Sequence, residues 1–222
     1  MRIGIVGGTG PAGTALAARL ADVGFEVVLG SRSKYRAMEA VDGLLERWSD
    51  RNLNIVSGDN EDAAKCEFIV IATPWDAAAI TARSVRDLLN GKVVVTMANA
   101  LARVDDEFVP LIPPRGSVAA SVQATLPNAR VAAAMQHVPA KELGDLSQSL
   151  DSDILVCSDD RECTAEVARV VSSIPGTRVL DCGNLSNATA IEAFTAVLLQ
   201  LNARYKTRVA LRLSGLDALP ID

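Results

Sequence analysis

The feature that most constrains the fold is a glycine-rich loop near the start of the chain. Residues 1–6 are an apolar run that predicts a β-strand, and residues 14–21 predict a helix. Gly8, Gly10 and Gly13 lie between them with the spacing G-x-G-x-x-G. In this context the motif is typical of dinucleotide binding, because the glycines allow a tight turn, a close pyrophosphate and close packing of the helix on the strand. The alternative is a glycine-rich turn that binds no ligand.

Ser31 and Arg32, which follow the second predicted strand, indicate which dinucleotide binds. An NAD-binding unit carries an Asp or Glu about twenty residues after the glycines. Here a hydroxyl and a guanidinium replace it, with Lys34 and Arg36 close by. These groups bind a 2′-phosphate, which a carboxylate would repel. The pattern therefore predicts NADP(H). The alternative is a helix N-cap at Ser33 with exposed basic neighbours.

Strands and helices alternate along the rest of the chain. This alternation predicts an α/β fold, with a Rossmann doubly wound parallel sheet over residues 1–140 and a small C-terminal α/β domain over residues 141–222. Further strands of the first domain are expected at 25–30, 53–56, 67–72, 92–96 and 130–135. Its further helices are expected at 34–48, 59–64, 77–89 and 117–126. The proline-rich segment 105–116 is expected to be largely irregular.

The C-terminal part has the same alternating pattern after a polar, loop-like segment at 141–151. Strands are expected at 153–157 and 177–181, and helices at 161–173 and 187–204, with Ser186 as the N-cap of the last helix. That helix carries an apolar stripe at helical spacing, formed by Ile191, Phe194, Val197, Leu198 and Leu201. The stripe predicts packing on the nucleotide domain or on a second subunit.

Loops at the ends of strands are the expected ligand contacts, since ligands of open α/β sheets lie beyond the carboxyl ends of the strands. The glycine loop contributes Gly8, Thr9, Gly10, Pro11, Ala12 and Gly13. Two later turns contribute Ala72, Thr73, Pro74, Trp75, Met97, Ala98 and Asn99. Trp75 is expected either to cover the ribose or nicotinamide or to pack at the start of a helix.

A further strand-end loop holds the one histidine of the chain. It consists of Gln136, His137, Val138, Pro139 and Ala140. His137 is a candidate to hydrogen-bond an acceptor ring or to relay a proton near pH 7. The alternative is a loop histidine satisfied by the backbone. Four basic residues near the C-terminus either meet an anionic ligand or form a solvated helix end: Arg204, Lys206, Arg208 and Arg212.

Composition excludes several other classes of function. The 222 residues carry a net charge of −5, which does not favour nucleic acid as a partner, and they contain no apolar run long enough to span a membrane. The N-terminus lacks the pattern of a signal peptide. The four cysteines have no C-x-x-C spacing. We therefore expect reduced core thiols, no metal site and a cytoplasmic protein.

Several separated segments, in this order, resemble one family, the NADPH-dependent F420 reductases, also called F420H2:NADP+ oxidoreductases. The matching residues are the Gly8–Gly13 loop, Gly30-Ser31-Arg32, Thr73-Pro74-Trp75, Val138-Pro139-Ala140, Cys157-Ser158-Asp159-Asp160 and Gly183-Asn184-Leu185-Ser186-Asn187. The resemblance covers nearly the whole chain, from residue 1 to about residue 216.

The resemblance implies a homodimer that transfers a hydride between NADP(H) and coenzyme F420, a deazaflavin. It assigns the phosphate site to Thr9, Ser31 and Arg32, with Lys34 or Arg36. It assigns the nicotinamide side to the turns at 72–75 and 97–99, and the deazaflavin pocket to residues 136–140 and Leu185. The family pattern has a histidine where this chain has Gln136, and His137 is displaced by one position.

Two other functions remain open from the sequence. One is an NADP-dependent reductase of a small carbonyl or imine, since such enzymes begin with the same domain. The other is a non-catalytic NADP-binding redox sensor. The chain has no Lys-Tyr pair of the kind that short-chain dehydrogenases use for proton transfer. Hydride transfer between two organic cofactors needs no such pair, because the cofactors supply the reactivity and the protein aligns them.

Overall fold

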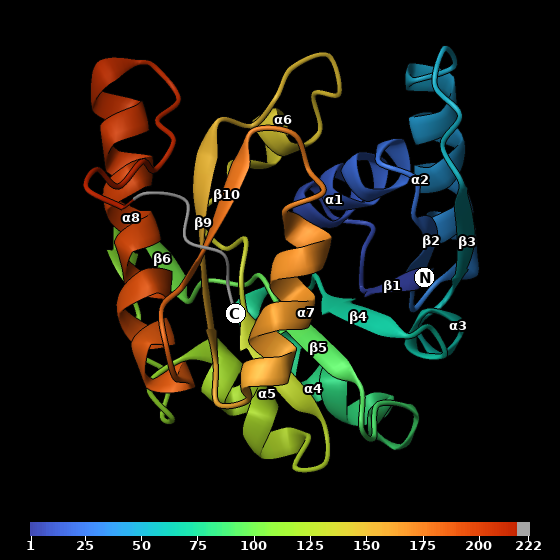
Figure 1. Ribbon diagram of the computed structural model, residues 1–222, viewed down its shortest axis with the longest axis horizontal. Helices are drawn as coiled ribbons and strands as arrows, with labels where there is room; N and C mark the ends of the chain where they lie inside the picture. The colour runs from blue at the N-terminus through green and yellow to red at the C-terminus, as the bar shows by residue number, and fades with distance from the viewer. Residues whose placement is uncertain (217–222) are drawn as a thin grey trace.

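The computed structural model describes residues 1–216 of the chain, which form one eight-stranded sheet with helices on both faces (Figure 1). The strands of this sheet are β1 (Arg2–Val6), β2 (Glu26–Ser31), β3 (Ile55–Asp59), β4 (Phe68–Ile71), β5 (Val93–Thr96), β8 (Arg130–Ala133), β9 (Ser152–Ser158) and β10 (Thr177–Asp181). The helices are α1 (Pro11–Asp22), α2 (Lys34–Arg47), α3 (Asn60–Ala64), α4 (Trp75–Ser84), α5 (Val118–Thr125), α6 (Ala140–Leu143), α7 (Arg161–Val171) and α8 (Ala188–Tyr205).

The spatial order of the strands is β10-β9-β8-β5-β4-β1-β2-β3. The six strands from β8 to β3 are all parallel, so their carboxyl ends share one edge of the sheet. Their order is that of a dinucleotide-binding sheet, and the direction of winding reverses between β1 and β4. The predicted α/β fold with a doubly wound parallel sheet is therefore confirmed.

The C-terminal strands continue the same sheet. β9 pairs antiparallel with β8, where Ala133 lies opposite Cys157, and β10 then pairs parallel with β9. The predicted boundary at residue 140 thus falls between two neighbouring strands of one sheet. The last six residues of the predicted C-terminal domain, 217–222, lie outside the described part of the chain.

Two apolar layers cover the two faces of the sheet. On one face α1, α2 and α7 pack on side chains such as Ile3, Ile5 and Val95. On the other face α3, α4, α5 and the start of α8 pack on Val6 and Val94. Neighbouring positions such as Val94 and Val95 point to opposite layers, which is why the buried parallel strands are apolar throughout.

Some predicted elements are wrong in detail. Segment 105–116 is not irregular throughout, because β6 (Leu101–Val104) and β7 (Glu107–Pro110) form a hairpin. The turn between them is made by Asp105, a non-glycine residue with φ of 53°, and Asp106. Its turn signal is therefore an Asp pair without glycine, while the prolines lie at and beyond the hairpin's end.

Element boundaries also differ from the prediction. β3 begins two residues later than expected, since its pairing with β2 runs from Ile55 to Asp59. Helix α4 ends at Ser84, and the short 3₁₀ helix Arg86–Leu88 follows it. Part of the expected loop 141–151 is helix α6. Ser186 does not cap α8, because it lies inside the 3₁₀ turn Leu185–Asn187 that precedes the helix.

A buried arginine joins α1 to the chain after β8. Arg19 is 2% exposed, and its guanidinium donates to the carbonyls of Leu143 and Gln148, each at 2.9 Å. It also donates to the carbonyls of Glu142 at 2.9 Å and Asp145 at 2.5 Å. Four hydrogen bonds from a charged group compensate for its burial. They fix α6 beside α1, and thereby place the loop at 136–140 next to the glycine loop.

Candidate functional site

The glycine loop leads from β1 into the N-terminus of α1. A Cβ on Gly13 would lie 2.4 Å from the carbonyl oxygen of Gly8, so the first turn of the helix can approach the loop only because residue 13 is glycine. A Cβ on Gly10 would meet no atom within 4 Å, and no side chain caps the helix there. The space beside Gly10 is therefore open, and the N–H groups of the first turn have no side-chain cap, as the binding of a pyrophosphate requires.

The predicted phosphate residues lie together at the end of β2. The Ser31 hydroxyl is buried and accepts from the N–H of Ser33 at 3.2 Å. Arg32 is exposed, and among residues 1–216 its side chain has no hydrogen bond or ion pair. Lys34 instead pairs with two carboxylates, those of Asp59 at 3.0 Å and Asp62 at 3.4 Å.

Arg32 is therefore the group available to a phosphate, whereas Lys34 already has two anionic partners. Arg36 is exposed, and its N–H donates to the Ser33 hydroxyl at 3.4 Å. Ser33 is thus the N-cap of α2, as the alternative interpretation predicted. The cap and the exposed guanidinium of Arg32 occur together, so the two interpretations do not exclude each other.

The turn after β4 lies against the glycine loop. A Cβ on Gly7 would lie only 2.1 Å from the Cγ2 atom of Thr73. The Thr73 hydroxyl is buried and has no hydrogen-bond partner among the described residues. Pro74 is the N-cap of α4, and Trp75 packs partly buried on the apolar layer beneath. The N–H of Ala72 donates to the carbonyl of Val6 and so continues the hydrogen bonding between β4 and β1.

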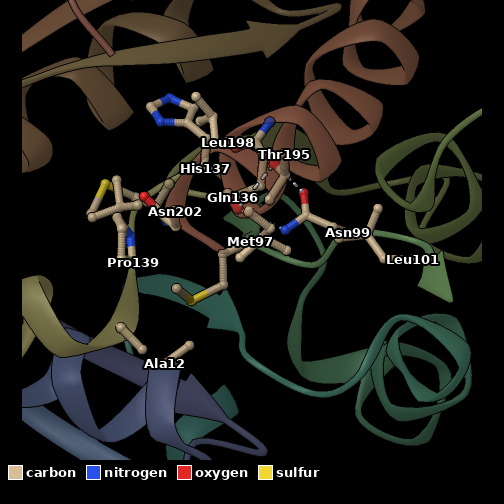
Figure 2. A pocket seen from close by; sticks show the side chains of 14 residues that line it. Ala12, Met97, Asn99, Leu101, Gln136, His137, Pro139, Thr195, Leu198 and Asn202 are labelled. Atoms are coloured by element: carbon tan, nitrogen blue, oxygen red, sulfur yellow. Dashed lines mark hydrogen bonds between the residues drawn. The ribbon is translucent and has the colours of Figure 1, made fainter. Parts of the chain in front are cut away.

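A cavity of about 220 Å³ opens at the same edge of the sheet, beyond the ends of β5 and β8 (Figure 2). Met97 lies at its centre, between Ala12 of α1 and the polar side chains of Asn99 and Thr195. The walls come from four parts of the chain, and the lining residues are Ala12, Met97, Asn99, Leu101, Met135, Gln136, His137, Val138, Pro139, Ala140, Thr195, Leu198, Leu199 and Asn202.

A short chain of hydrogen bonds holds the polar wall of the cavity (Figure 2). The Thr195 hydroxyl donates to the Asn99 side-chain oxygen at 3.1 Å. The Asn99 side-chain nitrogen then donates to the backbone carbonyl of Gln136 at 2.6 Å. These two bonds join helix α8, the end of β5 and the loop after β8. Sequence reasoning found Asn99 but not Thr195.

The side chain of Gln136 is an unsatisfied polar group in the wall of the cavity. It is 4% exposed, and neither its oxygen nor its nitrogen has a hydrogen-bond partner among the described residues. Met135 before it has φ of 66°, a left-handed conformation that turns the chain sharply at the end of β8. A buried amide without partners costs free energy, which a ligand offering both an acceptor and a donor would recover.

His137 lines the cavity on the side away from Ala12 (Figure 2). Its Nε2 atom accepts from the N–H of Leu155 in β9 at 3.3 Å, and its Nδ1 atom has no partner on another described residue. Burial lowers its pKa to about 4, so the ring is neutral at pH 7. These observations favour the alternative of a loop histidine satisfied by the backbone.

Leu185 is not brought to this cavity. It follows β10, which runs antiparallel to β8, so the chain leaves β10 towards the edge at which β8 begins. There Leu185 is buried and lines a different cavity, together with Arg115 and Asp159. The α8 residues Thr195, Leu198, Leu199 and Asn202 form the wall instead. Among these four wall residues, Leu198 belongs to the apolar stripe recognised in the sequence, and the other three do not.

The predicted basic cluster at the C-terminus is divided between separate ion pairs. Arg208 pairs with Glu142 at 2.7 Å. Arg212 pairs with Asp151 and, at 3.1 Å, with the fully buried Asp153. Hydrogen bonds from Arg178 and from Arg212 lower the pKa of Asp153 to about 2. These contacts attach the end of the described chain to β9 and β10.

A second buried carboxylate lies one helical turn before Thr195. Glu192 is 4% exposed and accepts from the N–H groups of Val118 at 2.8 Å and Ala119 at 3.1 Å. It therefore joins α8 to the N-terminus of α5. Burial nevertheless raises the pKa of Glu192 to about 7. The group that positions the cavity wall thus titrates near neutral pH.

Within residues 1–216, no group of three or more His, Cys, Asp or Glu side chains is placed to hold a metal ion. None of the helices in this part of the chain is both long and apolar enough to cross a membrane.

Comparison with known proteins decides the family. Residues 2–100 match the family model of coenzyme F420-dependent NADP oxidoreductases. The chain is 37% identical over 223 residues to the F420-dependent NADP reductase of Methanocaldococcus jannaschii, covering 98% of this chain and 100% of that one. The chain belongs to the F420-dependent NADP reductase family. The reductase of Methanothermobacter thermautotrophicus is 34% identical over 220 residues, covering 95% of this chain and 93% of its own.

Solved structures share the fold of this F420-dependent NADP reductase family member. A protein from Arthrobacter sp. FB24, provisionally named an F420-dependent NADP reductase, superposes with a TM-score of 0.80 at 24% identity and covers 96% of this chain and 100% of its own. An imine reductase from Bacillus cereus superposes with a TM-score of 0.63 at 16% identity and covers 93% of this chain but 63% of its own. At these identities the likeness concerns the fold.

The pKa of Glu192 predicts a pH-dependent stability. Because the folded state binds this proton more tightly than the unfolded state, the free energy of unfolding falls as pH rises from about 4.5 to 7. Glu192→Gln removes this dependence. As the pH rises through this range, the free energy of unfolding of the variant should increase relative to that of the wild type by up to about 3 kcal/mol. Urea unfolding at several pH values measures this difference.

Glu46→Gln, at an exposed position on α2, is the matched control and should give a profile parallel to that of the wild type. The lowered pKa of His137 produces a slope of opposite sign between about pH 4 and 6.5, but it is common to all three proteins and cancels in the difference. Parallel profiles for the wild type and Glu192→Gln would contradict the assignment.

Proposed function

We propose that this reductase transfers a hydride between NADP(H) and coenzyme F420, and that the two bind side by side at the carboxyl edge of the sheet. The observation that carries the proposal is the cavity with the buried, unpaired Gln136 amide, which lies directly beside the glycine loop at Ala12. When both are bound, the nicotinamide and the deazaflavin supply the hydride chemistry themselves.

The dinucleotide site is assigned to the glycine loop and the end of β2. The N–H groups at the N-terminus of α1 receive the pyrophosphate, and the exposed Arg32 receives the 2′-phosphate with the Ser31 hydroxyl beside it. The turns at 72–75 and 97–99 then lie along the path from the adenosine phosphate to the nicotinamide. Lys34 contributes less, because Asp59 and Asp62 already neutralise it.

The deazaflavin site is assigned to the cavity between Ala12, Met97 and helix α8. Met97 and Leu198 offer apolar contacts to a flat ring, while Gln136 offers one donor group and one acceptor. The pyrimidinedione edge of a deazaflavin carries the complementary C=O and N–H groups. The hydride passes directly from ring to ring, and the proton that the reduced deazaflavin takes up on its ring nitrogen is supplied by solvent. The reaction therefore does not require proton transfer from His137, which is neutral and bonded to the backbone.

We also propose that the protein is a homodimer that joins through α8 and the β6–β7 hairpin. α8 and β7 pack on each other, and these elements together with the two residues after β7 carry exposed apolar side chains: Val104, Val109, Leu111, Ile112, Phe194 and Val197. An exposed apolar surface of this kind is typical of an interface. A cytoplasmic location remains a prediction from the sequence and is consistent with four free cysteines.

Turnover tests the proposed function. Purified protein mixed with NADPH and oxidised F420 should bleach the absorbance of the deazaflavin, and the reverse reaction should restore it. Gln136→Leu should raise the KM for F420 roughly tenfold, since one buried hydrogen-bonding partner is lost, and should leave the KM for NADPH unchanged. Turnover of an imine or carbonyl compound without turnover of F420 would contradict the proposal.

Arg32→Asp tests the cofactor preference. It replaces a phosphate-binding cation by a like charge, so the KM for NADPH should rise between about 10- and 100-fold while the KM for NADH changes little. Arg86→Asp, an exposed arginine on the 3₁₀ helix after α4, is the matched control and should change neither value. Equal effects of Arg32→Asp on both cofactors would remove Arg32 from the phosphate site.

Val197→Lys tests the proposed interface. Val197 is 49% exposed on α8, so the folded protomer can accept the substitution, whereas a dimer would bury the charge. Light scattering after gel filtration should give the mass of a dimer for the wild type and of a monomer for the variant. Ile80→Lys, on the exposed face of α4, should remain dimeric. A monomeric wild type would rule out the interface.

A further inference from the structure

Two of the four free cysteines lie side by side on neighbouring strands. Cys157 belongs to β9, and Cys182 follows directly after β10. The register of this parallel pair places Val156 opposite Asp181, and the N–H of Cys182 continues the ladder by donating to the carbonyl of Val156 at 2.8 Å. The next residue on each strand is the cysteine. Neighbouring strands are about 4.8 Å apart, within the Cα–Cα range of disulfides.

The two side chains also point to the same face of the sheet. Leu155 and Leu180, which are paired in the register, both pack on the apolar layer beside α5 and α8. The cysteines lie two residues further along their strands, and the period of a strand is two, so their sulfur atoms point to that same layer. Cys157 is one of its buried members, and Cys182 packs against it from the margin.

The two thiols have different surroundings. The neighbouring Cys182 side chain and burial raise the pKa of Cys157, whereas the neighbouring Cys157 side chain lowers the pKa of Cys182. The thiol of Cys182 donates to the carbonyl of Leu180 at 3.6 Å. Cys182 is partly exposed, and the exposed residues Gly183 and Asn184 follow it, whereas Cys157 is fully buried. Cys182 is therefore the sulfur that a reagent in solution reaches, and Cys157 is placed behind it.

We propose that Cys157 and Cys182 form a redox-active dithiol that a peroxide converts to an intramolecular disulfide. The Cys182 thiolate attacks one oxygen of hydrogen peroxide, the O–O bond breaks, and the products are a sulfenic acid and, after protonation, water. The Cys157 sulfur then displaces the hydroxyl group, which leaves as a second water with the proton of Cys157. The two thiols lose two electrons and two hydrogens, and the peroxide is reduced.

This site is distinct from the hydride-transfer site, because neither cysteine lines the cavity at Gln136. The other two cysteines lack this arrangement. Cys66 is buried next to β4, and Cys163 is buried in α7 with its thiol donating to the carbonyl of Arg130 at 3.4 Å. Burial raises the pKa of both thiols. They should stay reduced while the pair reacts.

The experiment treats the full, reduced protein with hydrogen peroxide and then counts its thiols after denaturation. The titratable thiols should fall from four to two, the intact mass should fall by two hydrogens, and digestion should yield the peptides of Cys157 and Cys182 joined. A dithiol reductant should restore all four. Cys182→Ser should abolish the crosslink, whereas Cys66→Ala should still form it.

Other outcomes overturn the proposal. These are four thiols that persist, a gain of oxygen at Cys182 without a crosslink, or a disulfide that involves Cys66 or Cys163. Circular dichroism of Cys182→Ser, a replacement at a partly exposed position, shows that the variant is folded when the crosslink is absent. The readout contains no F420 or NADPH, so it stands or falls separately from the proposed function.

Discussion

The buried guanidinium of Arg19 is the interaction on which the geometry of the site depends. It lies in α1, directly after the glycine loop, and donates to four carbonyls between Glu142 and Gln148. The dinucleotide loop and the loop at 136–140 belong to segments more than a hundred residues apart, and this one side chain fixes the distance between them. All four acceptors are backbone atoms, so the bonds do not depend on the side chains of that segment.

The dinucleotide half of the site could be predicted from the sequence because its determinants are local. The spacing of Gly8, Gly10 and Gly13 reflects steric limits within a few residues, and Ser31 and Arg32 are placed by the end of one strand. The parallel strands were found for the same reason, since burial on both faces leaves an unbroken apolar run. Their ends were less certain, as the two-residue shift of β3 shows.

The acceptor half could be predicted only in part, because long-range contacts build it. Thr195 reaches the cavity through Asn99, which lies 96 residues earlier, and the local sequence around Thr195 is that of an ordinary amphipathic helix. The role of Arg19 is equally hard to predict, since no local sequence pattern indicates that it binds carbonyls more than a hundred residues away. Leu185 was expected in the pocket but lies elsewhere. Its position depends on the direction of β10, which a strand pattern alone does not give.

The antiparallel pairing of β8 with β9 has a consequence for how the acceptor site can evolve. Parallel strands need a long crossover that covers a face of the sheet, whereas an antiparallel pair can be joined by a connection of almost any length. Residues 134–151, which carry the acceptor wall, make this connection. The segment can therefore be lengthened, shortened or exchanged without rebuilding a crossover, so a new acceptor can be acquired on an unaltered dinucleotide platform.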